Sequence, residues 1–267
     1  MPLRPIVSCR NTIFAEMTKE CGRIIGPLVG KTQHHIRDSV DLINKLKDKS
    51  IPPNFSICSF DLKDMYTNIP QGPTLQILKD RLENDADLSK RTPMKVNDIL
   101  ALVKLDLDLA YFRWRGEYYK QLKGFGMGKS TSSPLSDIYM EEFEQAALAN
   151  YPTGDSNITP SDVILFWFRK ADDTIMAIHN DHIQPLHDYL NSIHPDVQWT
   201  KEIEEDHRIA MLDVTIIRND NGTLDFDVYR KPTHSRTLTN IFHSTAMYRL
   251  HTNSPPSILS HVRTNPN

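Results

Sequence analysis

Residues 56–70, SICSFDLKDMYTNIP, decide the fold, because an apolar strand here ends on acidic side chains. Small and apolar residues up to Phe60 are typical of a buried strand, and Asn68 with Pro70 marks the end of the strand pattern. Asp61 therefore stands at the exit of a strand. An aspartate is rarely buried without a partner, so at this place it is a salt-bridged acid, a helix cap or a metal ligand.

A second acidic feature lies at the tip of a predicted hairpin. Residues 163–178, VILFWFRKADDTIMAI, hold two apolar runs on either side of Ala171-Asp172-Asp173, which indicates two strands joined by a tight turn. Neighbouring carboxylates repel each other, and a divalent cation with oxygen ligands, Mg²⁺ or Mn²⁺, is the usual means of holding them ionised in one place. Considered alone, the hairpin also fits an exposed acidic turn.

Asp61, Asp172 and Asp173 together supply the three carboxylates that a two-metal phosphoryl-transfer site requires. In such a site one ion activates the attacking 3′-hydroxyl and the other holds the triphosphate, with the ions about 4 Å apart. We therefore expect these acids to lie together in the fold, although 111 positions (172 − 61) separate the first two.

The residues around these acids resemble the reverse transcriptases of Penelope-like retroelements. FDLKDMYTNIP is similar to the family's motif A, and Ala171-Asp172-Asp173 is similar to motif C. GFGMG and DIYMEEFE, which lie between them, are similar to motif B and the helix that follows it. The similar segments, in the family's order, are residues 3–8, 60–70, 124–128, 137–144, 171–173, 211–216 and 228–234.

The resemblance implies an α+β fold, namely a polymerase palm with a mostly antiparallel sheet backed by helices, partial fingers and an absent or truncated thumb. Residues 1–50 would form the partial fingers segment, and residues 51–234 the palm with motifs A, B and C. Residues 235–267 would be a C-terminal tail or the start of a thumb. Residues 199–205 and 209–218 have strand patterns, and Asp220-Asn221-Gly222 predicts a hairpin turn into a strand at residues 223–230, which completes a palm-like sheet.

The activity that the resemblance implies is that of an RNA-directed DNA polymerase, which adds a nucleotide from a dNTP to a primer 3′-hydroxyl. Asp61 and Asp172 would bind Mg²⁺ (or Mn²⁺), with Asp173 in support and the Leu62 carbonyl as a further ligand. The implied partners are an RNA template, a DNA primer and a dNTP. The implied nucleotide-binding residues are Arg4, Lys63, Asp64, Tyr66, Gly126 and Gly128, of which Tyr66 matches the position that crowds a ribose 2′-hydroxyl.

Two places depart from the family pattern. Relatives continue after Met-Gly with Ser-Pro-Leu-Ser-Pro, whereas this chain has KSTSS at residues 129–133, and Lys170 stands where relatives carry Tyr or a similar residue. A lysine next to the acids competes with a metal ion or contacts the primer backbone. Two alternatives stay open: a catalytically degenerate fragment that only binds nucleic acid, and an RNA-directed RNA polymerase, against which the bulky Tyr66 argues.

Composition bounds the class of protein. The 31 Lys and Arg against 34 Asp and Glu give a net charge of −3, which is less basic than expected for a protein that binds a duplex. No run of eighteen apolar residues and no signal-peptide pattern is present, so we expect a soluble intracellular protein without membrane contact, and the resemblance implies the nucleus. Cys9, Cys21 and Cys58 fit free thiols in a reducing compartment, and we assign them no function.

Residues 111–122 predict a hairpin that turns at Arg115-Gly116-Glu117. Its aromatic side chains are those of Phe112, Trp114, Tyr118 and Tyr119. Core packing is the interpretation that we adopt for these rings, and stacking on nucleic-acid bases is the alternative.

Overall fold

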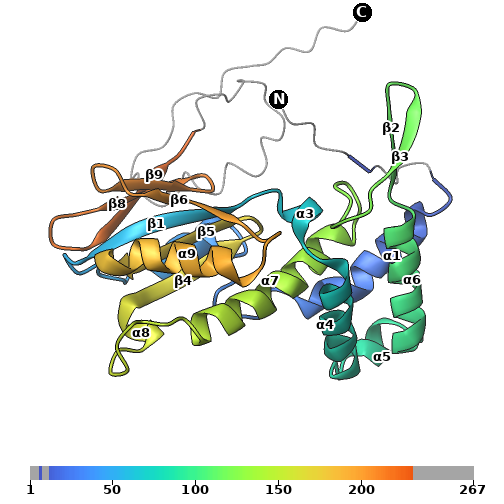
Figure 1. Cartoon of the computed structure of the whole chain (residues 1–267), viewed down its shortest axis with the longest axis horizontal. Coiled ribbons are helices and arrows are strands. Elements are labelled where there is room, and N and C mark those ends of the chain that lie inside the picture. Colours follow the sequence, from blue (N-terminus) through green and yellow to red (C-terminus); the bar gives the residue numbers. More distant parts are fainter. Residues whose placement is uncertain (1–5, 8–11, 231–267) are drawn as a thin grey trace, which may run out of the picture. The chain divides into compact units, whose positions relative to one another are not determined.

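The computed structural model describes residues 6, 7 and 12–230. The chain divides into two units, Met1–Tyr229 and Arg230–Asn267, and all of the described helices and strands belong to the first (Figure 1). The tail or thumb expected for residues 235–267 and the nucleotide contact expected for Arg4 lie outside the described residues. The predicted α+β class is confirmed, because antiparallel sheets pack against helices.

The elements occur in a mixed order along the chain. The helices are α1 (Ala15–Ile25), η1 (Gly26–Leu28), α2 (Ser39–Leu46), α3 (Met65–Asn68), α4 (Gln71–Glu83), α5 (Leu88–Arg91), α6 (Val96–Asp108), α7 (Ser132–Ala149), α8 (Pro160–Val163), η2 (Asn180–His182) and α9 (Ile183–Ile193). The strands are β1 (Phe55–Leu62), β2 (Tyr111–Trp114), β3 (Glu117–Lys120), β4 (Ile164–Lys170), β5 (Asp173–His179), β6 (Trp199–Ile203), β7 (Arg208–Met211), β8 (Val214–Arg218) and β9 (Leu224–Val228).

The central sheet has four antiparallel strands in the order β4-β5-β1-β6. The even-numbered side chains of β1 lie on the face of the sheet that packs against helices. The Phe60 ring meets Trp167 edge to face at 6.3 Å and His187 of α9 at 5.6 Å between ring centroids. Because side chains alternate along a strand, Asp61 points to the opposite face.

A second sheet has the order β7-β8-β9, and its first two strands stand where the sequence predicted one strand at residues 209–218. That prediction was wrong, because the chain turns back at Leu212-Asp213 and pairs Met211 with Val214. Leu212 has a φ of 57°, a conformation that glycine or asparagine usually signals, so the apolar residue concealed the turn. β7 packs against β1 and β5 of the central sheet, and Figure 1 shows β8 and β9 on the side of β1 away from α9.

A group of helices formed by α1, α4 and α6 packs on α7, which runs between this group and the central sheet (Figure 1). α6 contributes Ile99, Val103 and Leu107, whose spacing at i, i+4 and i+8 places one apolar stripe in the core. None of the helices in the described ranges is both long enough and apolar enough to cross a bilayer.

Burial lowers the reactivity of the two described cysteines. Cys21 and Cys58 are free thiols inside the core, where burial raises the pKa of Cys21 to about 11 and that of Cys58 to about 12. Because the thiolate is the reactive form, neither side chain is poised for nucleophilic or redox chemistry.

Gly124 has a φ of +64°, and a Cβ on it would lie 2.3 Å from the Tyr66 carbonyl oxygen. Gly116 has a φ of +92° and open space around it. Gly116→Ala therefore carries only the backbone strain, about 1–2 kcal/mol. Gly124→Ala is expected to lower the free energy of unfolding by at least about 2 kcal/mol more, because backbone must move as well. Urea unfolding of both variants measures the difference, and equal losses would contradict this packing.

Candidate active site

Strand pairing brings the three acids to one end of the central sheet. Asp61 on β1 lies directly opposite Asp173 on β5, and the Leu62 amide donates to the Asp172 carbonyl at 3.2 Å. Opposite residues in such a pair have Cβ atoms about 5 Å apart on the same face of the sheet. Asp61 and Asp172, which are 111 positions apart in the chain (172 − 61), are therefore neighbours in the fold.

The three carboxylates are near one another without forming a ready-made ligand set. In residues 6, 7 and 12–230, no three His, Cys, Asp or Glu side chains are close enough together to hold a metal ion. The donors are nevertheless of the kind that fits Mg²⁺ or Mn²⁺, since carboxylate oxygens and the Leu62 carbonyl are hard ligands. Metal binding at Asp61, Asp172 and Asp173 stays a prediction, and it requires side-chain rotation.

The residues after Asp61 turn sharply out of the strand. Lys63 and Asp64 are exposed, and Asp64 has a left-handed backbone with a φ of 48° at the start of α3. The Lys63 amide donates to the Gln198 carbonyl at 2.9 Å, which holds the turn to the end of α9 and its following loop. Both side chains thus lie beside the acids, and their contact with a nucleotide stays a prediction.

Tyr66 connects the three predicted motifs. Burial raises the pKa of its hydroxyl above the ordinary value, and the charges of Asp137 and Asp172 act in the same direction, whereas a hydrogen bond with Ser133 lowers it. These interactions place the Tyr66 hydroxyl between the start of α7 and the Asp-Asp turn. Its predicted role against a ribose 2′-hydroxyl is untested.

The glycines of the predicted motif B serve chain packing. A Cβ on Gly126 would lie 2.9 Å from the Val7 side chain, and one on Gly128 would lie 3.1 Å from the Val7 carbonyl. The Phe125 amide donates to the Tyr66 carbonyl, so the same loop also joins motif B to motif A. Gly126 is buried and Gly128 is exposed, and their predicted contact with a nucleotide stays a prediction.

Arg169 is a site residue that the sequence reasoning missed. Its side chain is 3% exposed and forms ion pairs with Asp137 at 2.8 Å and Glu144 at 2.9 Å, both on α7. Nη1 also donates to the Ala171 carbonyl at 2.9 Å, where Ala171 has a left-handed φ of 54°. Burial lowers the pKa of the guanidinium, but the charges of Glu144 and Asp137 outweigh this and raise it.

The signal for this network was present in the sequence. An arginine at an inward position of an apolar strand needs acidic partners. Asp137, Glu141 and Glu144 are spaced at i, i+4 and i+7, so they lie on one face of α7, and Glu141 pairs with Arg81 of α4 at 2.6 Å. Read together, these patterns predict that the helix after motif B anchors the Asp-Asp turn.

Lys129, one of the two departures from the family pattern, is a buried structural residue. Its ammonium lies 3.1 Å from the Asp106 carboxylate, with both side chains 1% exposed, and it also donates to the Asp106 carbonyl. The hydroxyls of Thr18 and Thr131 donate to the same carboxylate at 2.6 Å each. The unusual KSTSS segment therefore anchors the motif B loop to α6 and α1.

Lys170, the other departure, stands opposite Asp173 in the β4–β5 pairing. Its ammonium forms no ion pair with Asp172 or Asp173, both of which are in the described part of the chain. Burial lowers the pKa of the His35 imidazole, and the charge of Lys170 lowers it further. The charge of Lys170 thus acts on His35, and the strand pairing puts the Lys170 side chain on the same face of the sheet as Asp173.

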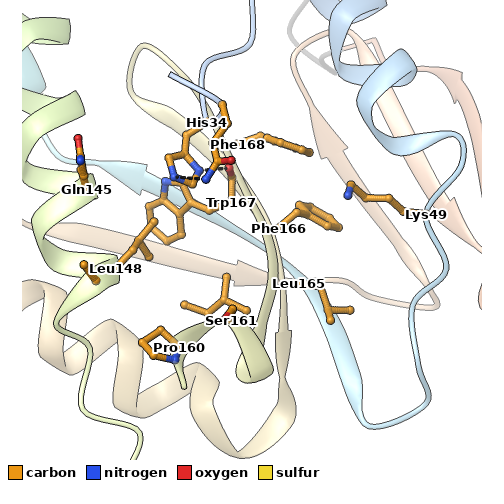
Figure 2. A pocket seen from close by; sticks show the side chains of 13 residues that line it. His34, Lys49, Gln145, Leu148, Pro160, Ser161, Leu165, Phe166, Trp167 and Phe168 are labelled. Atoms are coloured by element: carbon orange, nitrogen blue, oxygen red, sulfur yellow. Dashed lines mark hydrogen bonds between the residues drawn. The ribbon is translucent and has the colours of Figure 1, made fainter. Parts of the chain in front are cut away.

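A cavity of about 560 Å³ lies along β4 (Figure 2). It is bordered by the stacked rings of Phe166 and Phe168, with centroids 5.2 Å apart, and Lys49 lies 5.7 Å from the Phe166 ring. None of the residues that line it is an aspartate or glutamate, and the three acids are absent from its wall. The cavity is therefore not the predicted catalytic site.

Comparison with known proteins identifies the fold. No family model matches the chain, and no curated protein matches it. Among solved structures, apo telomerase from Candida tropicalis, truncated from its C-terminal domain, superposes with a TM-score of 0.58 at 14% identity, covering 82% of this chain and 46% of that one. Telomerase from Candida albicans, in complex with a TWJ fragment of telomeric RNA, gives 0.56 at 15% identity, covering 89% and 40%.

The described part of this chain has a reverse transcriptase-like polymerase fold. Telomerase is a reverse transcriptase, and the likeness extends over most of this chain. The palm-like arrangement predicted from motifs A, B and C is therefore confirmed as a fold. The chain spans less than half the length of these telomerases.

Removing one partner of the Lys129–Asp106 pair leaves a buried charge. Lys129→Met is expected to lower the free energy of unfolding by about 3–5 kcal/mol. Lys129→Met with Asp106→Asn removes both charges. The Asn oxygen still accepts from one threonine, and its NH2 group can donate to the hydroxyl of the other. The double variant should therefore recover at least half of that loss. Lys90→Met, in an exposed pair with Asp87, is the control and should change stability little. A double variant less stable than Lys129→Met would contradict this role.

The position of the Lys170 ammonium is tested by His35. Lys170→Met is expected to raise the pKa of His35 toward its ordinary value, because a neighbouring cation disfavours the imidazolium. The pH titration of the His35 ring by NMR measures this change. Lys201→Met, on the helix-facing side of β6, is the control and should leave the His35 pKa unchanged. An unchanged value in Lys170→Met would mean that the ammonium lies elsewhere, against the acids or in solvent.

Proposed function

We propose that this chain is the palm, with part of the fingers, of an RNA-directed DNA polymerase of the Penelope-like kind. The observation that carries the proposal is the pairing of Asp61 with Asp173 across β1 and β5, with Asp172 in the adjoining turn. Three acids at one end of a polymerase-like sheet are the constellation that nucleotidyl transfer uses. The similarity of residues 60–70 and 171–173 to motifs A and C supports the narrower assignment.

In this proposal the acids and the strand ends hold the reacting groups. Asp61 and Asp172 would bind Mg²⁺ (or Mn²⁺), with Asp173 in support and the Leu62 carbonyl as a further ligand. When bound, the ions lower the pKa of the primer 3′-hydroxyl and offset the charge of the triphosphate. The pairing of β1 with β5 keeps the two ligand-bearing strands in register, which would hold the proposed ligands in fixed places for the 3′-hydroxyl and the dNTP.

Nucleotide selection is assigned to residues next to the acids. The Tyr66 ring, held by its hydrogen bond with Ser133, would crowd a ribose 2′-hydroxyl and so favour a dNTP. Lys63 and Asp64 are exposed beside Asp61, and by resemblance they would contact the nucleotide. Arg4, Gly126 and Gly128 complete the proposed nucleotide contacts by resemblance. An RNA template and a DNA primer are the proposed partners, and the nucleus is the proposed location.

A second candidate function is nucleic-acid binding without catalysis. The observation that favours it is that the three carboxylates are not gathered into a metal-binding group among the described residues, while Lys170 stands opposite Asp173. Against it, Lys129 is fully compensated by Asp106, so the altered motif B segment is not a sign of damage to the site.

Primer extension on an RNA template tests the proposal. With Mg²⁺ and dNTPs the chain is expected to extend a DNA primer, and Asp172→Asn or Asp61→Asn should reduce extension by at least about 10³-fold, because each removes a proposed metal ligand. Asp181→Asn, an exposed acid beyond the other end of β5, is the matched control and should retain activity. The free energy of unfolding should be kept in all three variants.

The possible outcomes separate the candidates. Extension with NTPs in place of dNTPs would favour an RNA-directed RNA polymerase. Binding of the template and primer without extension, at any Mg²⁺ or Mn²⁺ concentration, would favour the non-catalytic alternative. Extension that survives Asp172→Asn would show that the Asp-Asp turn is not the site.

A further inference from the structure

The hairpin β2–β3 is an exposed arm. Figure 1 shows it extending beyond α6 and α1, and no other helix or strand in the described ranges packs along it. Tyr118 is 75% exposed, Tyr111 51% and Tyr119 41%, so the expectation of core packing was wrong for Tyr118 and Tyr119. A two-stranded hairpin is only marginally stable in water, and exposed rings on it indicate a surface that meets a partner.

One face of the hairpin carries only aromatic and cationic side chains. The cross-strand pairing sets Tyr111 opposite Lys120 and Arg113 opposite Tyr118, and these residues share one face because side chains alternate along each strand. The Arg113 guanidinium lies 5.7 Å from the Tyr118 ring, and the Lys120 ammonium lies 5.9 Å from the Tyr111 ring. Lys120 also pairs with Asp108 at 3.1 Å.

The opposite face is different in kind. The rings of Phe112 and Tyr119 stack there with centroids 5.7 Å apart, and this contact holds the two strands together. The face formed by Tyr111, Arg113, Tyr118 and Lys120 takes no part in this stacking, and its two rings make cation–π contacts with Arg113 and Lys120.

Charge selects the class of partner. Residues 111–123 hold four cations, Arg113, Arg115, Lys120 and Lys123, and one acid, Glu117, within a chain whose net charge is −3. The local balance of +3 (4 − 1) is complementary to a polyanion. Exposed rings between such cations stack on unpaired bases, whereas the paired bases of a duplex do not offer their faces.

We propose that the face formed by Tyr111, Arg113, Tyr118 and Lys120 binds single-stranded RNA. β3 ends at Lys120, and Phe125, five residues later, contacts the Tyr66 backbone of motif A. Five residues span at most about 18 Å, so the arm is within reach of an unpaired template segment next to the acid-bearing end of the sheet. The identity of that RNA as template rests on the proposed function, whereas the binding itself does not.

Fluorescence anisotropy with a fluorescein-labelled 20-nucleotide oligouridine tests the proposal without nucleotide or metal. Tyr118→Ser is expected to weaken binding about 5-fold or more, and Tyr118→Phe to keep it, because phenylalanine still stacks. Arg113→Gln with Lys120→Gln should lower the slope of log K against log salt by about 1.4, or about 0.7 for each lost phosphate contact. Arg37→Gln with Lys90→Gln, which removes the same charge from exposed sites elsewhere, is the control.

Each outcome decides for or against the hairpin. Failure of the wild-type chain to bind the probe, or equal weakening by the hairpin variants and the control, would overturn the proposal. So would concentration-dependent self-association of the wild type that Tyr118→Ser abolishes, because the face would then be a protein contact. RNA binding that depends on the hairpin in a chain that fails to extend a primer would support this inference and reject the polymerase, and the converse result would do the opposite.

Discussion

The buried guanidinium of Arg169 is the interaction on which the acid-bearing end of the sheet depends. It joins α7 to β4 through two carboxylates and donates a hydrogen bond to the carbonyl of Ala171, whose backbone is left-handed. A left-handed alanine is held only where the surroundings determine it, and here the determinant is a charge that cannot be deprotonated or solvated. Asp172 and Asp173 follow Ala171 directly. The Arg169 contacts on the helix-facing side of the sheet therefore fix the backbone direction of both acids.

Buried or partly buried ion pairs also fix two other places in the described part of the chain. Lys129 with Asp106 fixes the motif B loop on α6, and Arg81 with Glu141 fixes α7 on α4. Such pairs add little net stability because both charges lose water, but they penalise any packing that separates the partners. An apolar interface would be simpler, but these ion pairs hold the motifs in a single register. A site made of separate segments needs such a register.

The parts of the fold with regular patterns were predictable, and those set by tertiary contacts were not. The strands on either side of Asp172 and the hairpin at Gly116 carry their own signals, so the sequence located them. The turn at Leu212 has no glycine or asparagine, and its left-handed backbone follows from the pairing of β7 with β8. Similarly, the alternating pattern of residues 111–122 predicts two strands but not whether other residues cover them. Lys129 departs from the family pattern, and only the fold shows that Asp106 neutralises it.

The pairing of β1 with β5 brings the three acids to one place, yet they form no metal-binding group among the described residues. Ionised acids on paired strands repel each other, and a divalent cation between them would offset that repulsion. Gathering them around a cation would require rotation about side-chain bonds, since the strand register and the turn are already fixed by hydrogen bonds and by Arg169. Side-chain ordering costs at most about 2 kcal/mol for each residue, whereas reordering the backbone of the turn would cost that much for every residue moved. A site whose backbone is already fixed, and in which only side chains would need to rotate, is therefore the arrangement with the smaller ordering cost.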